Sequence, residues 1–461
     1  MPTSHIYFAT PLRSLSRYLA SLVLVLIAVA PVGATPLDAY VAAPDPAYRY
    51  ELQPDATVTM PTVEAKVYYM ASQHWLKDAE VDRTLWEHWV VVYVPKERTH
   101  TPAMVFIDGG SNGGKAPGPD HALAQIAVQT HSVVVAVKQI PNQPLHFTEE
   151  KMDKYKEKGR GEDALITYGW DKFLNGGRAE WLARLPMTKA VVRAMDLVQK
   201  EQPSVDAFFV MGGSKRAWTT WTVAAVDKRV IGIAPAVIDV LNFVPSLDNH
   251  IKSYGFWAPA VGNYEEMNIT GRYHSPRMRE LLDIVDPYSY VDRLTMPKYI
   301  VNATGDQFFP PNSSQYYFDG LQGEKYLRYM PNTDHGLSGE AFLNAASFYN
   351  ALLTKTPRPE FTWKSNADGS LEVDCATAPK KVLLWQAHNP KARDFRLEEI
   401  GKAWTSTPLT GSDGVYRALP DLPGTGYTAF MIELTFENPT FPLPFVFTTG
   451  VNILPDTYPG K

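Results

Sequence analysis

One segment of the chain reads Phe208-Phe209-Val210-Met211-Gly212-Gly213-Ser214-Lys215-Arg216-Ala217-Trp218. An apolar run ends in two glycines and a serine, and apolar residues with helical spacing follow directly. A strand that turns sharply into a helix in this way forms a nucleophile elbow, in which backbone strain holds the serine hydroxyl clear of the main chain. We therefore interpret Ser214 as the candidate nucleophile.

The segment departs from the usual elbow pattern G-x-S-x-G at its last position, where Arg216 stands in place of glycine. That glycine normally lets the helix pack closely on the strand. Arg216 therefore needs more room, or its stem must lie along the surface. Because Gly-Gly-Ser also occurs in ordinary turns, the interpretation of Ser214 depends on partners further along the chain.

Short apolar runs occur on both sides of this segment, and several are nearly continuous instead of alternating: 88–94, 103–107, 133–137, 207–211, 231–237, 299–303 and 326–330. Continuous runs suit strands that are buried on both faces of a sheet. Segments with helical spacing lie between many of them, at 189–200, 217–226 and 338–353. The pattern predicts an α/β fold with a doubly wound, mainly parallel sheet over residues 85–356.

The rest of the chain divides around this sheet. Connections at 138–187 and 240–293 are too long for single helices, and we expect cap insertions that shape a substrate cleft, with solvated decoration as the alternative. Residues 35–84 are expected to form an N-terminal wrap with one candidate strand at 65–70. Beyond residue 356, short strands alternate with turn clusters, which predicts an antiparallel β-sandwich domain over 357–461.

Two polar residues follow later strands. Asp306 comes after the run 299–303, and His335 comes after the run 326–330. Carboxyl ends of parallel strands meet at one edge of a sheet, so both side chains are expected near Ser214. A serine nucleophile needs a base and a carboxylate that orients the base, and α/β-hydrolases carry them in the chain order Ser, acid, His. We predict a triad of Ser214, Asp306 and His335.

A second acid competes with Asp306. Asp239 follows the run 231–238, and some hydrolases place the triad carboxylate one strand earlier than others. Sequence alone leaves the choice between Asp239 and Asp306 open.

The negative charge of a tetrahedral intermediate requires preorganised hydrogen-bond donors. The backbone N–H of Lys215, directly after the nucleophile, is one predicted donor to this oxyanion hole. The glycine-rich stretch Asp108-Gly109-Gly110-Ser111-Asn112 follows an early strand. We therefore expect the second donor to be the N–H of Gly109 or Gly110.

Residues 1–34 have the composition of a secretory signal peptide. Arg13 and Arg17 precede an apolar stretch at 19–29, and Val32-Gly33-Ala34 offers small residues for cleavage. The apolar stretch is too short to span a membrane in the mature protein, although an uncleaved anchor is the alternative. We expect a secreted or periplasmic protein without a stable membrane span after signal cleavage.

Composition narrows the range of partners. The formal net charge is −5, and loss of the two arginines in the first 34 residues makes it more negative, so nothing favours nucleic acid. The expected partner is a small-molecule or peptide substrate.

No spacing typical of metal ligands appears, so neither a metal nor a cofactor is indicated. Cys375 is the single cysteine, so no internal disulfide forms. The oligomeric state stays open.

Over roughly residues 45–450, the chain resembles the PhoPQ-activated pathogenicity-related protein family, whose relatives include an autocrine proliferation repressor of a social amoeba. The motifs that carry the resemblance are Ser72-Gln73-x-Trp75, Trp86-x-His88-Trp89, Asp108-Gly109-Gly110-Ser111-Asn112, Gly212-Gly213-Ser214-Lys215-Arg216, Gly305-Asp306-Gln307-Phe308-Phe309 and Asn332-x-Asp334-His335. The resemblance implies an exported, α/β-hydrolase-like protein associated in bacteria with virulence regulation. It also implies that Arg216 is a trait of the family.

Together these features lead to a hypothesis of an exported serine hydrolase that cleaves an ester or an amide, as an esterase or a peptidase. Neither the substrate nor the bond cleaved can be read from the sequence. The competing hypothesis is a catalytically silent hydrolase fold that serves as a binding or signalling protein, because fold alone does not establish activity.

Overall fold

The computed structural model describes Met1 and residues 33–421 and 424–459. The predicted signal peptide, residues 1–34, lies almost wholly outside this part of the chain. Residues 35–461 are grouped as one compact unit. Within the described ranges, no helix has the length and apolar character needed to cross a bilayer.

Among the described residues, 15 strands belong to one continuous sheet. Its central strands are parallel, and in spatial order they are β6 (Val134–Val137), β5 (Ala103–Ile107), β7 (Phe208–Gly213), β8 (Val230–Ala236), β9 (Lys298–Ala303) and β10 (Lys325–Met330). On one side, β4 (Leu85–Pro95) pairs antiparallel with β6, and β3 (Val63–His74) pairs antiparallel with β4. This order, with a strand-to-helix turn at Ser214 after β7, is that of the α/β-hydrolase fold. The predicted doubly wound, mainly parallel sheet is confirmed.

The N-terminal residues add an edge to this sheet. The candidate strand at 65–70 proves to be the longer β3, which also pairs with β1 (Arg49–Leu52) and β2 (Val58–Thr59). Helix α1 (Pro36–Ala42) begins with a capping box in which Thr35 and Asp38 bond each other's backbone N–H groups.

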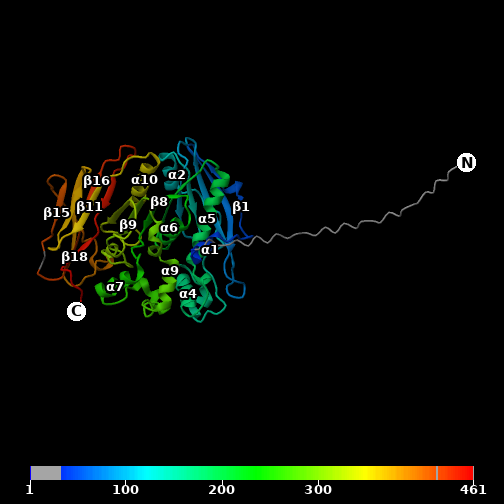
Figure 1. Ribbon diagram of the computed structural model, residues 1–461, viewed down its shortest axis with the longest axis horizontal. Helices are drawn as coiled ribbons and strands as arrows, with labels where there is room; N and C mark the ends of the chain where they lie inside the picture. The colour runs from blue at the N-terminus through cyan, green and yellow to red at the C-terminus, as the bar shows by residue number, and fades with distance from the viewer. Residues whose placement is uncertain (2–32, 422–423, 460–461) are drawn as a thin grey trace. The chain divides into compact units, whose positions relative to one another are not determined.

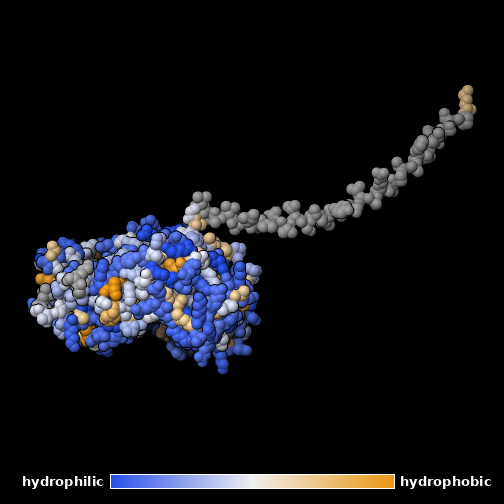
Figure 2. Space-filling view, turned by 90° about the horizontal axis from the view of Figure 1, so that it is seen from below, coloured by the Kyte–Doolittle hydropathy of each residue, from blue (hydrophilic) through white to orange (hydrophobic). Residues whose placement is uncertain are grey.

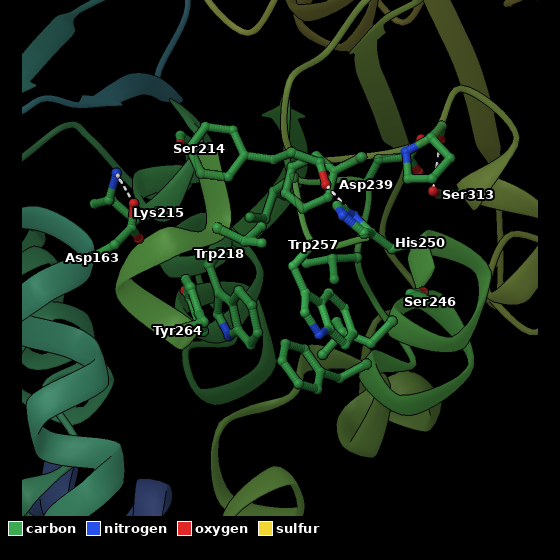
Figure 3. Close-up of a pocket in the computed structure, with 18 of the residues that line it drawn as sticks. Asp163, Ser214, Lys215, Trp218, Asp239, Ser246, His250, Trp257, Tyr264 and Ser313 are labelled. Carbon is green, nitrogen blue, oxygen red and sulfur yellow. Dashed lines mark hydrogen bonds and ion pairs between the residues drawn. The ribbon is translucent and has the colours of Figure 1, made fainter. Parts of the chain in front are cut away.

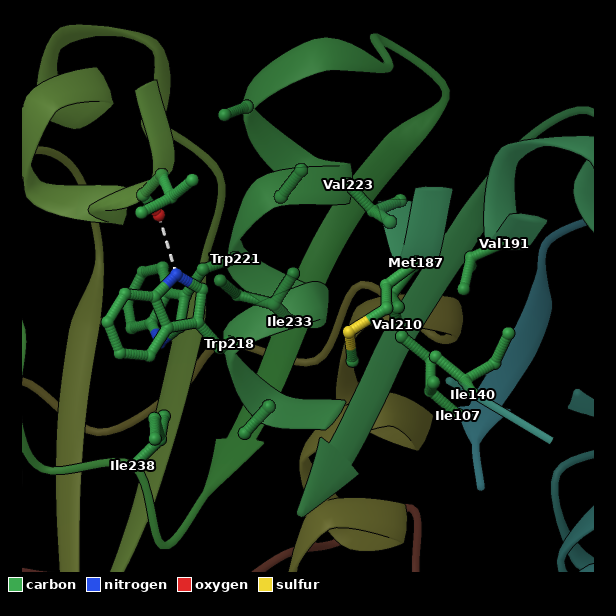
Figure 4. Close-up of a cluster of buried hydrophobic side chains, with 14 of the residues drawn as sticks. Ile107, Ile140, Met187, Val191, Val210, Trp218, Trp221, Val223, Ile233 and Ile238 are labelled. Carbon is green, nitrogen blue, oxygen red and sulfur yellow. Dashed lines mark hydrogen bonds between the residues drawn. The ribbon is translucent and has the colours of Figure 1, made fainter. Parts of the chain in front are cut away.

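Helices cover both faces of the sheet (Figure 1). Helices α5 (Arg184–Glu201) and α6 (Lys215–Val226) share one buried cluster, and α2 (His121–Gln129) and α10 (Gly339–Leu353) share another. Side chains of β7 alternate between them, because Val210 lies in the first cluster and Phe209 in the second. Figure 4 shows Trp218 and Trp221 of α6 over these strands. Each large side chain buried in this way stabilises the fold by roughly 1.5–3 kcal/mol.

The two long connections fold into helices. The first contains α3 (Asp153–Lys158) and α4 (Glu162–Leu174), and the second contains α7 (Phe243–Tyr254), α8 (Gly262–Glu266) and α9 (Pro276–Val285). Helix α4 contacts both α8 and α9, and α4, α7 and α9 lie along the lower side of Figure 1. Short 3₁₀ turns at Ala179–Trp181, Pro259–Val261 and Pro287–Arg293 belong to these connections, and two more lie elsewhere, at Pro54–Ala56 and Ser313–Tyr316.

The C-terminal strands form two antiparallel sheets. One continues the main sheet, because β17 (Phe445–Thr448) pairs with β10 and is followed by β16 (Tyr427–Phe436), β13 (Lys381–Asn389) and β14 (Thr405–Pro408), with β18 (Asn452–Leu454) beside β16. The other contains β11 (Phe361–Ser365), β12 (Leu371–Cys375) and β15 (Val415–Ala418). Leu371 of β12 and Leu434 of β16 share one buried cluster, so the two sheets pack as a sandwich. The boundary at residue 356 stays a prediction.

One face of the molecule is shown in Figure 2. It is mostly hydrophilic, and apolar residues gather on it only in small, separate groups. Groups of this size are ordinary on soluble proteins.

A buried ion pair joins the central strands to the C-terminal ones. Arg328 Nη1 of β10 lies 2.6 Å from Glu433 Oε2 of β16, and both side chains are nearly inaccessible to solvent. Glu433→Gln is expected to lower the free energy of unfolding by about 3 kcal/mol, because it leaves the Arg328 charge buried beside only the half-exposed Glu340. The matched control is Glu437→Gln, which removes the exposed pair with Lys380 and should change stability much less. Equal effects in urea unfolding would contradict a structural role for the buried pair.

Candidate active site

Ser214 occupies a strained turn between β7 and α6. Its backbone angles are φ 58° and ψ −126°, a region that residues with a side chain rarely adopt and that costs about 1–3 kcal/mol. The turn is held because the Ser214 N–H donates to the Ala236 carbonyl at 2.8 Å and the Trp218 N–H donates to the Ser214 carbonyl at 3.1 Å. The predicted strand-turn-helix context of the serine is therefore present.

Arg216 is accommodated by an ion pair of its side chain and by Gly212, which lies in β7. Its guanidinium binds both carboxylate oxygens of Glu162, at 2.6 and 2.7 Å, and its Nε donates to the Ile140 carbonyl. A Cβ atom at Gly212 would lie 2.9 Å from the Arg216 carbonyl oxygen. The helix thus packs closely on the strand through Gly212, while the Arg216 side chain extends toward α4.

The structure brings Ser214, His335 and Asp306 together. His335 Nε2 lies 2.7 Å from Ser214 Oγ, and His335 Nδ1 lies 2.8 Å from Asp306 Oδ2. Asp306 is buried and His335 is partly exposed. These are the contacts through which an orienting carboxylate and a base serve a serine hydroxyl.

The loops that carry Asp306 and His335 are bonded to each other. The Phe308 N–H donates to Asp306 Oδ1, and the His335 N–H donates to Gln307 Oε1. The ring centroids of Phe308 and His335 are 4.4 Å apart. His250 of α7 supports the same loop, because its Nδ1 lies 3.1 Å from the Phe308 carbonyl oxygen.

C-terminal residues hold these loops from the other side. The Leu397 N–H of the short helix α11 (Leu397–Ile400) donates to the Gly305 carbonyl. The Asn332 side chain exchanges two hydrogen bonds with the Trp404 backbone. The β-rich C-terminal region therefore contributes directly to the position of the histidine and the acid.

Asp239, the rival acid, lines the pocket beside Ser214 but is bonded to two tyrosines. Its two carboxylate oxygens accept hydrogen bonds from the Tyr317 and Tyr329 hydroxyls, each at 2.6 Å. Burial raises the pKa of Asp239 from 3.8 to about 7. The carboxylate bonded to His335 is that of Asp306.

The two candidate oxyanion-hole donors in the glycine-rich loop after β5, the N–H groups of Gly109 and Gly110, differ in their hydrogen bonding. The Gly109 N–H donates to Asp108 Oδ1 at 2.7 Å. For the Gly110 N–H, no acceptor is found among the described residues, and the carbonyl of Gly110 accepts from Gln143 Nε2. Gly110 has a φ of 142°, and a Cβ there would meet Gln139. Of the two, only the Gly110 amide is free to donate.

Glu162 links this loop to the elbow. Besides Arg216, it receives a hydrogen bond from Gln143 Nε2, and its Oε2 lies 3.0 Å from Lys215 Nζ. Although burial acts to raise the pKa of Glu162, its cationic partners lower it to about 2. Gln143 therefore connects Glu162 directly to the Gly110 carbonyl.

A pocket opens beside Ser214 (Figure 3). Helices of both long connections line it, and most of the lining is apolar or aromatic, including Trp218, Phe243, Trp257, Tyr264 and Phe309. The polar side chains include Asp163 and Arg184, which the sequence analysis did not single out. No local motif marks such residues, because they reach the pocket only through the folding of the connections. In the described part of the chain, no group of three or more His, Cys, Asp or Glu side chains is arranged to hold a metal.

Comparison with known proteins defines the family. A model of the PhoPQ-activated pathogenicity-related proteins matches residues 37–396. The chain belongs to this family. A relative from Dictyostelium discoideum, autocrine proliferation repressor protein A, is 36% identical over 473 residues, and the match covers 95% of this chain and 94% of the relative. The resemblance stated from the motifs is confirmed.

Several solved structures are similar over about two thirds of the chain. Acetyl xylan esterase 1 from Thermoanaerobacterium sp. JW/SL YS485 has a TM-score of 0.49 and 15% identity, with 69% of this chain and 93% of that chain covered. Glucuronoyl esterase from Solibacter usitatus has a TM-score of 0.41 and 13% identity, with 68% and 90% covered. The Pyrococcus horikoshii acylaminoacyl peptidase has a TM-score of 0.40 and 11% identity, with 68% and 43% covered.

The two elbow glycines give a matched test of the packing at Ser214. Gly212→Ala is expected to lower the free energy of unfolding by about 1–3 kcal/mol, because its methyl group would meet the first turn of α6. Gly213→Ala should be tolerated, since open space surrounds that position. Urea unfolding measures the stability of both variants. Similar effects of the two substitutions would contradict the close packing of α6 on Gly212.

The raised pKa of Asp239 predicts a pH dependence of stability. Since the folded pKa lies above the unfolded one, the folded protein binds more protons between 3.8 and about 7, and this residue's contribution to stability falls as pH rises through that window. Relative to Asp239→Asn, the wild-type free energy of unfolding should fall by up to about 1.4 kcal/mol per pH unit. Urea unfolding from pH 4.5 to 7.5 measures the difference, and parallel pH profiles would refute the shift.

Proposed function

We propose that this protein is an exported serine hydrolase that cleaves an ester or an amide. The observation that carries the proposal is the chain of contacts from Ser214 Oγ to His335 Nε2 and from His335 Nδ1 to Asp306. A base and an orienting acid at these distances are what a serine needs to become a nucleophile. The pocket beside Ser214 supplies a place for the substrate.

In the proposed reaction, Ser214 Oγ attacks the substrate carbonyl carbon as its proton passes to His335 Nε2. The Lys215 and Gly110 amides stabilise the oxyanion, with Gly109 less suited because its N–H is already bonded to Asp108. The bond to the leaving group then breaks, and the leaving alcohol or amine takes the proton from Nε2. Water next attacks the acyl-enzyme, gives a proton to Nε2, and releases a carboxylic acid as Ser214 regains its hydrogen.

Asp306 acts through His335 in this scheme. Its carboxylate accepts a hydrogen bond from the Nδ1–H group of His335, so Nε2 has a free lone pair toward Ser214. It also stabilises the imidazolium that forms when the serine proton is transferred. Asp239 has no part in the reaction.

Export and family membership complete the proposal. The first 34 residues have the composition of a signal peptide, and the PhoPQ-activated family name is associated with pathogenicity. Among substrates, a peptide and a small ester are both compatible with an aromatic pocket between helices. We therefore propose a secreted or periplasmic esterase or peptidase. Its proposed role in virulence can be tested genetically.

Labelling with a fluorophosphonate probe tests the nucleophile. Wild type is expected to be labelled at Ser214, Ser214→Ala should not be labelled, and His335→Ala should react at least about 100-fold more slowly because proton transfer is lost. Asp306→Asn should also react more slowly. Glu437→Gln, which removes only an exposed ion pair, is the control variant and should be labelled like the wild type. A folded wild type that fails to react would overturn the proposal.

The alternative is a catalytically silent hydrolase fold that binds or signals. It is favoured by the relative at 36% identity, whose name describes repression of proliferation and not hydrolysis. The two proposals differ in what Ser214→Ala does. If the Ser214→Ala protein loses the biological effect of the wild type, the result supports the hydrolase proposal. If the variant keeps that effect, the result supports the binding or signalling proposal.

A further inference from the structure

The pocket beside Ser214 contains a buried cation that the proposed reaction does not use. Arg184, at the start of α5, is 1% exposed and lines the same pocket as Ser214. Its Nη1 donates to the Lys215 carbonyl at 2.7 Å, and its guanidinium lies 4.4 Å from the centre of the Trp218 ring. Its Nε is buried without a hydrogen-bond acceptor in the described structure.

The neighbouring carboxylates are committed to other cations. Glu162 binds Arg216 through two hydrogen bonds and also pairs with Lys215. Asp163 Oδ2 lies 3.4 Å from Lys215 Nζ, a contact visible in Figure 3. Two cations, Arg216 and Lys215, thus share these two carboxylates, and Arg184 has no ion-pair partner among the described residues.

A buried cation lowers the stability of the folded protein unless an anion pairs with it. Burial lowers the pKa of Arg184 to about 10, so its guanidinium still carries a full charge at neutral pH. Trp218 offsets part of the desolvation penalty through its ring face. An unpaired buried charge still carries a large desolvation penalty, and a ligand anion would remove much of it.

The shape of the pocket indicates the kind of anion. Its volume is about 60 Å³, space for roughly four water molecules. Its walls beside Arg184 include Trp218 and Tyr264. A planar carboxylate matches a guanidinium in shape as well as charge, because its two oxygens can accept two parallel N–H bonds.

We propose that Arg184 recognises a carboxylate on the substrate, so that the compound cleaved is an ester or amide that also carries an ionised carboxyl group. The position of the scissile carbonyl at Ser214 rests on the proposed function. Binding of the carboxylate at Arg184 does not, because it needs no catalysis. The Trp218 ring stacked on the guanidinium lowers the local polarity, which strengthens such an ion pair.

Binding to the Ser214→Ala protein tests the proposal independently of catalysis. The probes are benzoate, phenylacetate and succinate, each compared by calorimetry with its neutral primary amide. At least one carboxylate should bind about tenfold or more tightly than its amide, and added inorganic sulfate should compete weakly. Equal affinity within every pair, or no binding by any carboxylate, would overturn the proposal.

Two arginine variants test whether the preference for carboxylate over amide depends on Arg184. Arg184→Gln should abolish the preference for carboxylate over amide, whereas Arg193→Gln should retain it, because Arg193 lies on the same helix but pairs with Asp196 outside the pocket. A preference that persists in a folded Arg184→Gln protein would also overturn the proposal. Should Arg184→Gln fail to fold, the carboxylate–amide comparison without it decides the outcome.

The failure of each proposal can be recognised separately. A carboxylate preference in a protein that never reacts with fluorophosphonate would leave the anion site standing and remove the hydrolase. Labelling of Ser214 without any carboxylate preference would do the reverse.

Discussion

The left-handed backbone of Ser214 is the constraint on which the site depends. A non-glycine residue with a φ of 58° keeps that conformation only when its surroundings enforce it. Here the enforcement comes from the hydrogen bond to Ala236 of β8 and from the first turn of α6, packed on Gly212. The parallel sheet then brings the loops after β9 and β10 to the same edge, where Asp306 and His335 complete the chain of contacts.

Arg216 shows how this chain solves a packing problem that glycine solves in the usual elbow. Its side chain leaves the strand–helix contact and binds Glu162 of α4, so the elbow becomes tied to the first long connection. Through Gln143, the same carboxylate reaches the Gly110 loop. One acidic residue therefore couples the nucleophile, the candidate oxyanion loop and the pocket wall, and the charges it neutralises leave Arg184 without a partner.

Sequence predicted those features that local patterns determine. Continuous apolar runs gave the strands of the parallel sheet, and the glycines before Ser214 gave the elbow. Asp306 and His335 could be found because each directly follows a buried strand. The choice against Asp239 required Tyr317 and Tyr329, which pair with it only in the folded chain. Likewise, the pairing of β10 with β17 joins residues more than one hundred positions apart, and no local pattern encodes it.

The most direct measurement of the central claim is a crystal structure of the protein after reaction with a small phosphonate. The account predicts phosphorus bonded to Ser214 Oγ, with the phosphoryl oxygen about 2.7–3.1 Å from the amide nitrogens of Lys215 and Gly110. A phosphonate attached to another residue, or a phosphoryl oxygen out of reach of both amides, would contradict it.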